Sequence, residues 1–242
     1  MNITKYLSPM LNPIRHRNVL IQILRKIYSN PVLGPNLGFK GGTAAMLFYG
    51  LPRFSVDLDF DLLNPGLEEK ILTEMPKTLQ KLGDFNEAVK KNYTLLFILS
   101  YQKGQRLIKV EISRRPIYND SFEKKNFLGI PMLVVKQSDM VSSKLAALLT
   151  RKKFASRDVF DIWYFLEKNW EINEGVLLKK TGLSKKSALI KATKMIEKIN
   201  PDLFMPGLGE LVDNKTKYWI KHHLKEETLF LLRASTKSIL NL

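Results

Sequence analysis

The sequence contains no cysteine, and this absence excludes several kinds of chemistry at once. Disulfides, thiol nucleophiles and thiolate zinc sites all require a cysteine sulfur. A metal ion would have to be held by oxygen or imidazole, and only three histidines are present. His16, His222 and His223 lie apart from the motifs described below, and we assign them no chemistry.

Long apolar runs are also missing. No segment stays apolar over the length that is needed to cross a bilayer. The N-terminal stretch MNITKYLSPMLNPIRHRN has polar and charged residues throughout, so it lacks the apolar core of a signal peptide. We therefore expect a cytoplasmic protein with no membrane partner.

Acidic residues are scarce beside basic ones, with 23 Asp and Glu against 39 Lys and Arg, and the formal net charge is +16. Such an excess attracts polyanions. The basic residues are spread along the whole chain and are not gathered beside an apolar anchor, which favours nucleic acid over a membrane surface. With 45% hydrophobic residues, the chain can still bury a substantial core.

Hydrophobic periodicity predicts both helices and strands. The predicted helices cover 16–30, 43–50, 66–90, 138–150 and 157–170, and Gly83 and Asp84 are expected to break the third of them near its end. The predicted strands cover 53–63, 93–102, 105–114 and 131–135. The second and third strands form a hairpin around Lys103-Gly104, and the rest of the chain is mostly helical. Caps are expected at Thr43, at Ser138-Asp139 and at Ser156. This order predicts an α+β fold, with a mixed β-sheet flanked by helices and followed by a helical C-terminal part.

The segment RFSVDLDFDLL places aspartates at every second position, Asp57, Asp59 and Asp61. On a strand, residues two apart leave the same face roughly 6.5 to 7 Å from each other, so the carboxylates of Asp57 and Asp59 can lean toward one point. Aspartate is depleted from strands, and crowded carboxylates raise one another's pKa unless a cation compensates them. A solvated strand face is the alternative, but the row favours a site for a hard divalent cation.

Two glycines, Gly41 and Gly42, precede Thr43 and a short apolar helix. Glycine lets the backbone approach a ligand closely, and the amide groups at a helix N-terminus bind phosphate. Two glycines before a helix often form an ordinary turn. The pair becomes informative because the aspartate row follows it on the next predicted strand.

These residues together resemble a known family. The motif resembles the signature of the AbiEii/AbiGii toxin family, which belongs to the nucleotidyltransferases of the polymerase β type. It consists of Lys40-Gly41-Gly42-Thr43-Ala44, Tyr49-Gly50-Leu51, Arg53, Ser55 and Asp57-Leu58-Asp59-Phe60. A second block resembles the family on two consecutive helices, with Lys144, Arg151, Arg157, Asp158 and Asp161. Ile162 stands where the family usually has leucine. The resemblance covers roughly residues 36 to 165.

The element order allows a domain boundary near 136 or near 170. We divide the chain into a nucleotidyltransferase core over 1–136 with an N-terminal helix, and a helical domain over 137–242 that completes the active-site cleft. The resemblance implies a transferase fold. It also implies transfer of a nucleoside monophosphate from a nucleoside triphosphate (NTP), dependent on Mg²⁺ or Mn²⁺. For several relatives the acceptor is the 3′ end of tRNA, so that translation is blocked. The antitoxin would be a separate protein.

Glu111 is our candidate for the third carboxylate. It alternates with the apolar residues of its strand, so an adjacent strand can bring it to Asp57 and Asp59 as a metal ligand or as the base for the attacking hydroxyl. An exposed glutamate paired with a neighbouring lysine is the alternative. Lys40 can lie near the triphosphate, whereas Arg53 and Ser55 can contact phosphate or brace the glycine turn.

Lys144 borders the apolar stripe of its helix and can reach a phosphate. Asp158 and Asp161 share a helix face, so they can position Lys144 or Arg151, or contact the nucleotide with Arg157. Asp158 can instead simply stabilise the first turn of its helix. We therefore assign a catalytic role to Lys144 and Asp161, and substrate binding to Arg157 and Asp158.

Two other functions remain open at this point. The same fold can transfer the nucleotide to a hydroxyl of a protein or of a small molecule. A module that binds RNA without catalysis is the third possibility, and its RNA binding would be indifferent to divalent metal and to both aspartates.

Overall fold

The computed structural model describes residues 11–117 and 121–239. Residues 1–10, which include most of the segment that was compared with a signal peptide, lie outside this range. The chain divides into two compact units. Of the described residues, the first unit holds 11–50, 54–117 and 122–134, and the second holds 51–53, 121 and 135–239.

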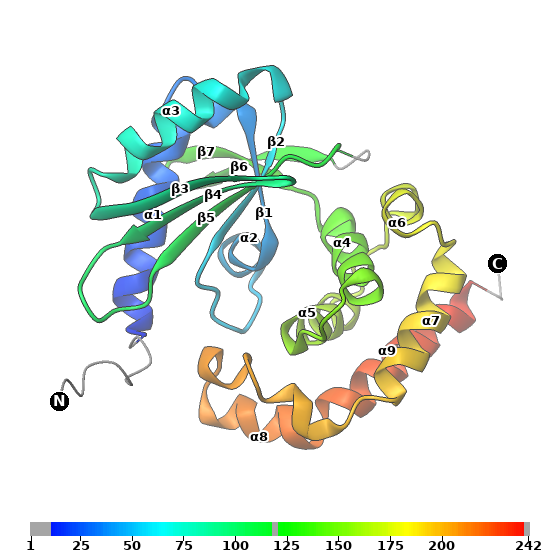
Figure 1. Cartoon of the computed structure of the whole chain (residues 1–242). Coiled ribbons are helices and arrows are strands. Elements are labelled where there is room, and N and C mark those ends of the chain that lie inside the picture. Colours follow the sequence, from blue (N-terminus) through cyan, green and yellow to red (C-terminus); the bar gives the residue numbers. More distant parts are fainter. Residues whose placement is uncertain (1–10, 118–120, 240–242) are drawn as a thin grey trace. The chain divides into compact units, whose positions relative to one another are not determined.

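The first unit is built on a mixed sheet with the strand order β3-β4-β5-β2-β1-β7-β6 (Figure 1). Strand β2 runs antiparallel to β1 and parallel to β5, and β1 runs parallel to β7. The predicted α+β fold with a mixed sheet is therefore confirmed. The strands are β1 (Leu37–Lys40), β2 (Leu58–Leu62), β3 (Asp84–Lys91), β4 (Thr94–Ser100), β5 (Ile108–Ser113), β6 (Phe122–Phe127) and β7 (Ile130–Val135).

One face of this sheet is apolar. Phe39 and Phe60 are fully buried on neighbouring strands, with ring centroids 5.2 Å apart, and Tyr28 of α1 (Pro13–Ser29) lies 6.5 Å from Phe60. Helix α3 (Glu68–Leu79) lies close to α1 beside the sheet (Figure 1). Side chains alternate along a strand, so the residues between the apolar ones leave the opposite face. That opposite face carries the acidic row.

Helix α2 (Gly41–Tyr49) follows β1 without a loop and ends at Gly50, where φ is +71°. The expected stop at Gly50 is present, but the expected cap at Thr43 is wrong. The helix begins two residues earlier, and the Thr43 hydroxyl instead donates to the backbone oxygen of Asp57. Thr43 therefore ties α2 to the segment that enters β2.

Three differences from the predicted elements concern the sheet. The strand predicted over 53–63 is shorter, because only Leu58–Leu62 pairs with neighbouring strands. The helix predicted over 66–90 is two elements, α3 and β3. β3 is an edge strand with mostly exposed residues, so it lacks the apolar period of a buried strand. Strands β1 and β6 are short or charged, and the sequence pattern did not predict them.

The second unit is helical, as expected for the C-terminal part. Its helices are α4 (Gln137–Thr150), α5 (Ser156–Glu167), α6 (Glu174–Thr181), α7 (Lys185–Glu197), α8 (Asn214–His222) and α9 (Leu224–Ser238). Short 3₁₀ turns occur in both units, at Gly34–Asn36, Pro65–Leu67, Pro201–Phe204 and Gly209–Leu211. Throughout the described ranges, every helix is too short or too polar to span a membrane.

The caps expected at Ser138-Asp139 and at Ser156 are wrong. Helix α4 starts at Gln137, and the Asp139 carboxylate accepts from the backbone N–H of Ser121 and from the amide of Asn173 at 2.6 Å. Helix α5 starts at Ser156, whose hydroxyl donates to the backbone oxygen of Pro206 at 2.8 Å. These buried side chains tie the helices to other segments of the same unit.

Candidate active site

The acidic row lies where three strands of the first unit meet. Asp59 and Asp61 belong to β2, and Asp57 immediately precedes it. In the register of the sheet, Asp59 stands opposite Lys40 on β1 and opposite Glu111 on β5. Because adjacent strands are about 4.8 Å apart and paired residues share a face, the side chains of Asp59 and Glu111 leave the sheet side by side. The tertiary fold thus brings Glu111 next to Asp59.

The glycine turn touches this row directly. Gly41 has φ of +80°, in the left-handed region that favours glycine, and a Cβ added there would lie 2.2 Å from Oδ2 of Asp59. Gly42 follows as a buried residue of the first turn of α2. The backbone at the helix start and the Asp59 carboxylate are therefore in immediate contact.

Asp57 is held by its backbone and by its side chain. Its backbone oxygen accepts from the Thr43 hydroxyl, and its Oδ1 accepts from the backbone N–H of Lys109 at 3.2 Å. One link goes to α2 and the other to β5. Asp57 thus has a defined position although it precedes the strand.

His16 supports the segment before Asp57. Its Nε2 lies 2.8 Å from the backbone oxygen of Val56, and its Nδ1 lies 3.0 Å from the Tyr101 hydroxyl. With Nε2–H donating to Val56, Nδ1 is left to accept from Tyr101. Burial lowers the pKa of His16 and outweighs the opposing effects of the Val56 hydrogen bond and of Asp57. The imidazole is therefore held neutral.

The sequence carries a signal for His16, although we assigned it no role above. His16 is fully buried together with Leu20, Ile23, Leu24 and Ile27, and all five share the apolar stripe of α1. A histidine on such a stripe needs a polar partner inside the protein. The sequence alone did not show that this partner precedes the acidic row.

Asp61 differs from the other two aspartates. It is buried within β2, and its carboxylate forms an ion pair with Nζ of Lys40. Lys40 was expected near the triphosphate, and the structure places its ammonium group on Asp61. Ser55 is also buried, but it lies outside β2, so the strand predicted over 53–63 does not extend to it.

The second unit holds the other predicted residues in a buried ionic cluster. Arg53 binds Asp161 with two hydrogen bonds, from Nε to Oδ1 at 2.6 Å and from Nη2 to Oδ2 at 2.7 Å. Nζ of Lys144 lies 2.8 Å from Asp161 and 2.9 Å from Asp158. Arg151 completes the cluster, 2.9 Å from Asp158.

The charges in this cluster are balanced locally. Burial by itself would raise the pKa of Asp161, but the charges of Arg53 and Lys144 outweigh it and hold that pKa below its usual range. Burial would likewise lower the pKa of Lys144, and Asp161 and Asp158 raise it instead. Of the roles considered for Asp158 and Asp161, their ion pairs fit the positioning of Lys144 and Arg151. Arg157 lies half-buried at the start of α5.

The carboxylates of the first unit suit a metal that arrives with a nucleotide better than a prebuilt metal cage. In the described parts of the chain, no three acidic or histidine side chains converge closely enough to hold a metal ion by themselves. Magnesium in nucleotide enzymes is usually bound by one or two carboxylates, with phosphate oxygens and water completing the octahedron. Asp57 and Asp59 would be the two such ligands here, with Asp59 against the glycine turn and Glu111 beside Asp59.

Solved structures support the fold. JHP933 from Helicobacter pylori is 18% identical, with a TM-score of 0.61, and the match covers 97% of this chain and 96% of that one. A second H. pylori structure, described as that of a candidate nucleotidyltransferase, is also 18% identical, with a TM-score of 0.62 and coverage of 95% and 96%. No curated protein gives a significant match.

The sequence profile of a family matches residues 22–213, which is most of the chain. The profile describes nucleotidyl transferases, in agreement with the fold and with the carboxylates beside the glycine turn, so the protein is a nucleotidyltransferase. The chain belongs to the AbiEii toxin family of type IV toxin–antitoxin systems. The resemblance seen in the sequence is confirmed, and the possibility of a module without catalysis loses its support.

Proposed function

We propose that the protein transfers a nucleoside monophosphate from an NTP to an RNA, at the 3′ end of a tRNA, with Mg²⁺ or Mn²⁺ bound by Asp57 and Asp59. The observation that carries this proposal is the contact of Asp59 with Gly41, next to Glu111. It brings a phosphate-binding turn and the carboxylates together. The balancing cation would offset their charge and that of the phosphates.

In the proposed reaction, the acceptor hydroxyl oxygen forms a bond to the α-phosphorus, and the bond from that phosphorus to the bridging oxygen breaks. Pyrophosphate leaves, and Glu111 takes the proton of the hydroxyl. The backbone amides at the start of α2 bind the phosphates. Thr43 and Lys109 keep Asp57 in place while this happens.

RNA is the proposed acceptor because of the charge of the chain. A formal charge of +16 supplies phosphate contacts that do not depend on sequence, and salt should weaken them. A toxin acting on tRNA would block translation in the cytoplasm, and a cognate antitoxin protein would restrain it.

The test is incubation with each labelled NTP in turn and total RNA. We expect one nucleotide to label a tRNA-sized band, and Asp57→Ala and Asp59→Ala to abolish the label. Asp84→Ala is the matched control, because Asp84 is an exposed aspartate on edge strand β3. Labelled protein with unlabelled RNA would favour a protein acceptor, and full activity of both active-site variants would refute the proposal.

A further inference from the structure

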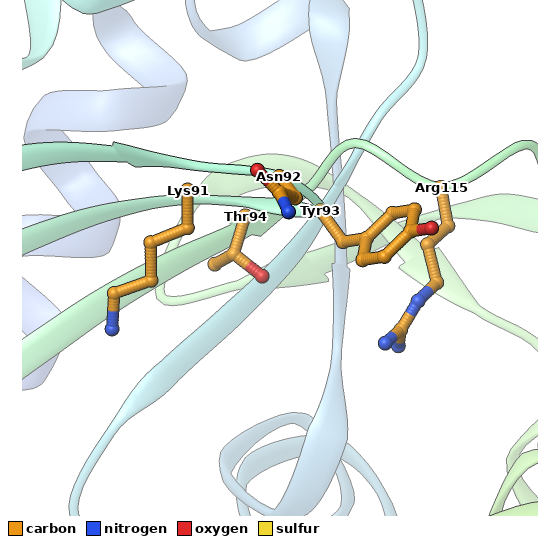
Figure 2. A pocket seen from close by; sticks show the side chains of 5 residues that line it. All are labelled: Lys91, Asn92, Tyr93, Thr94 and Arg115. Carbon is orange, nitrogen blue, oxygen red and sulfur yellow. The ribbon is translucent and has the colours of Figure 1, made fainter.

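An open pocket of about 500 Å³ lies at the turn between β3 and β4, lined by Lys91, Asn92, Tyr93, Thr94 and Arg115 (Figure 2). The side chain of Tyr93 is prominent there, because the residue is 59% exposed. The guanidinium carbon of Arg115 lies 5.2 Å from the centre of its ring. None of these five residues belongs to a motif predicted from the sequence.

The register of the sheet places this pocket on the same face as the carboxylates. Thr94 pairs with Ser113 of β5, and Ser113 pairs with Asp61 of β2. Lys91 pairs with Thr94, so its side chain also leaves this face, and Figure 2 shows Lys91, Thr94 and Arg115 pointing to one side. Thr94 therefore lies two strands away from Asp61, and Asp61 lies two residues along β2 from Asp59. Together these spacings put Thr94 about 12 Å from Asp59.

The turn is braced from below, so its shape does not depend on a ligand. Nη1 of Arg114 donates to the backbone oxygens of Lys91 at 2.8 Å and of Asn92 at 3.0 Å. Nε of Arg114 binds Glu68 at the start of α3, and the backbone N–H of Arg114 donates to Tyr93 at 2.9 Å. Preorganisation of this kind lowers the entropic cost of binding.

The pocket combines the two features that bind single-stranded nucleic acid. An exposed aromatic ring can stack on any of the bases, and neighbouring cationic side chains contact the phosphates. Arg115 also contributes a planar guanidinium, which stacks on rings and binds phosphate. A double helix keeps its bases stacked on each other, so only an unpaired nucleotide can use Tyr93.

We propose that this pocket binds an unpaired nucleotide of the acceptor RNA, with the base on Tyr93 and the flanking phosphates on Lys91 and Arg115. This proposal rests on the proposed function for the identity of the partner. The separation from Asp59 lets one short single strand occupy the pocket and present its end to the carboxylates. The pocket thus selects RNA with an unpaired end.

The experiment measures binding of the full chain to a fluorescent single-stranded RNA of mixed sequence, without NTP, over a range of salt concentrations. Tyr93→Ala should weaken binding by about 5-fold to 100-fold, as expected for the loss of one stacked base. Tyr93→Phe should retain binding. Lys91→Ala and Arg115→Ala should each lower the salt slope by about one. A duplex of the same sequence should show no effect of Tyr93→Ala.

Lys103→Ala is the matched control for charge, because Lys103 is an exposed lysine of the turn at the other end of β4. Equal weakening by Lys103→Ala and Lys91→Ala, or unchanged single-strand binding in Tyr93→Ala, would overturn the proposal. So would an absence of RNA binding by the unmodified chain. The binding assay needs no transfer reaction, so the two proposals can fail separately. If RNA binding depends on Tyr93 but the protein does not label RNA, the pocket is supported and only the proposed transfer is refuted.

Discussion

The carboxylate of Asp59 lies against the backbone of Gly41 with no room for a side chain between them. The two residues come from different elements, because Gly41 opens α2 and Asp59 lies within β2. A ligand held by the amides of this turn would therefore meet the carboxylate at once. This contact explains physically why the glycine motif and the acidic motif occur together.

Gly41→Ala should slow transfer by about 100-fold while the protein stays folded. A non-glycine residue at positive φ costs about 1–2 kcal/mol, and the added Cβ would push the Asp59 carboxylate away. A displacement of about 1 Å can reduce the rate by about 100-fold. The measurements are the NTP labelling rate and the free energy of unfolding in urea.

Gly104→Ala is the control for this substitution. Gly104 has the same φ of +80°, but an added Cβ there meets nothing within 4 Å. It should lose similar stability and keep its activity. Equal activity of the two variants would show that the contact with Asp59 does not matter.

Asp161→Asn should destabilise the protein by about 3–5 kcal/mol, because it leaves buried cations without their counter-charge. The side chain of Asp161 is 0% exposed and that of Arg53 is 2% exposed. Urea unfolding measures the effect. Lys168→Ala, which removes an ion pair with Glu167 on α5, should change stability much less, since both partners are largely solvated. Similar values for the two variants would contradict a structural role for Asp161.

Acid should destabilise the protein through His16. The folded state holds the pKa of His16 below the ordinary histidine value of 6.5, so the unfolded state binds the proton first as the pH falls. Neutral His16 makes its full contribution to the free energy of unfolding above pH 6.5, and this contribution is lost as the pH falls through the folded pKa. The free energy of unfolding falls by at most about 1.4 kcal/mol per pH unit for this one group. The charged groups that act on it are Asp57 and Arg106, and Tyr101 donates to its ring.

The measurement is the free energy of urea unfolding between about pH 7.5 and about pH 5.5. His16→Gln should flatten the slope, because glutamine can still donate to Val56 but does not titrate. His223→Gln, at an exposed histidine after α8, should leave the slope as it is. An unchanged slope in His16→Gln would assign the pH dependence to other groups.

Local patterns predicted much of the fold correctly. The hairpin of β4 and β5 and the helices α1, α4 and α5 follow from alternating or helical apolar spacing, which depends on each segment alone. Strand β3 was predicted as helix because it is an exposed edge with charged residues, and the short β1 is a strand only because β2 and β7 flank it. Hydrogen-bond pairing between segments that are distant in the chain produces no hydrophobic periodicity in the sequence of either segment.

For the site, the sequence by itself determined the chemistry: a glycine pair, alternating aspartates and an excess of positive charge, each of which is a property of residue types and their order. Only the tertiary structure decided which of these groups meet. In the tertiary structure Asp59 contacts Gly41 and lies beside Glu111. Lys40 forms an ion pair with Asp61, and Arg53 forms a buried ion pair with Asp161. These choices depend on strand register and on the low solvation of buried charges, and both arise only when distant segments pack together.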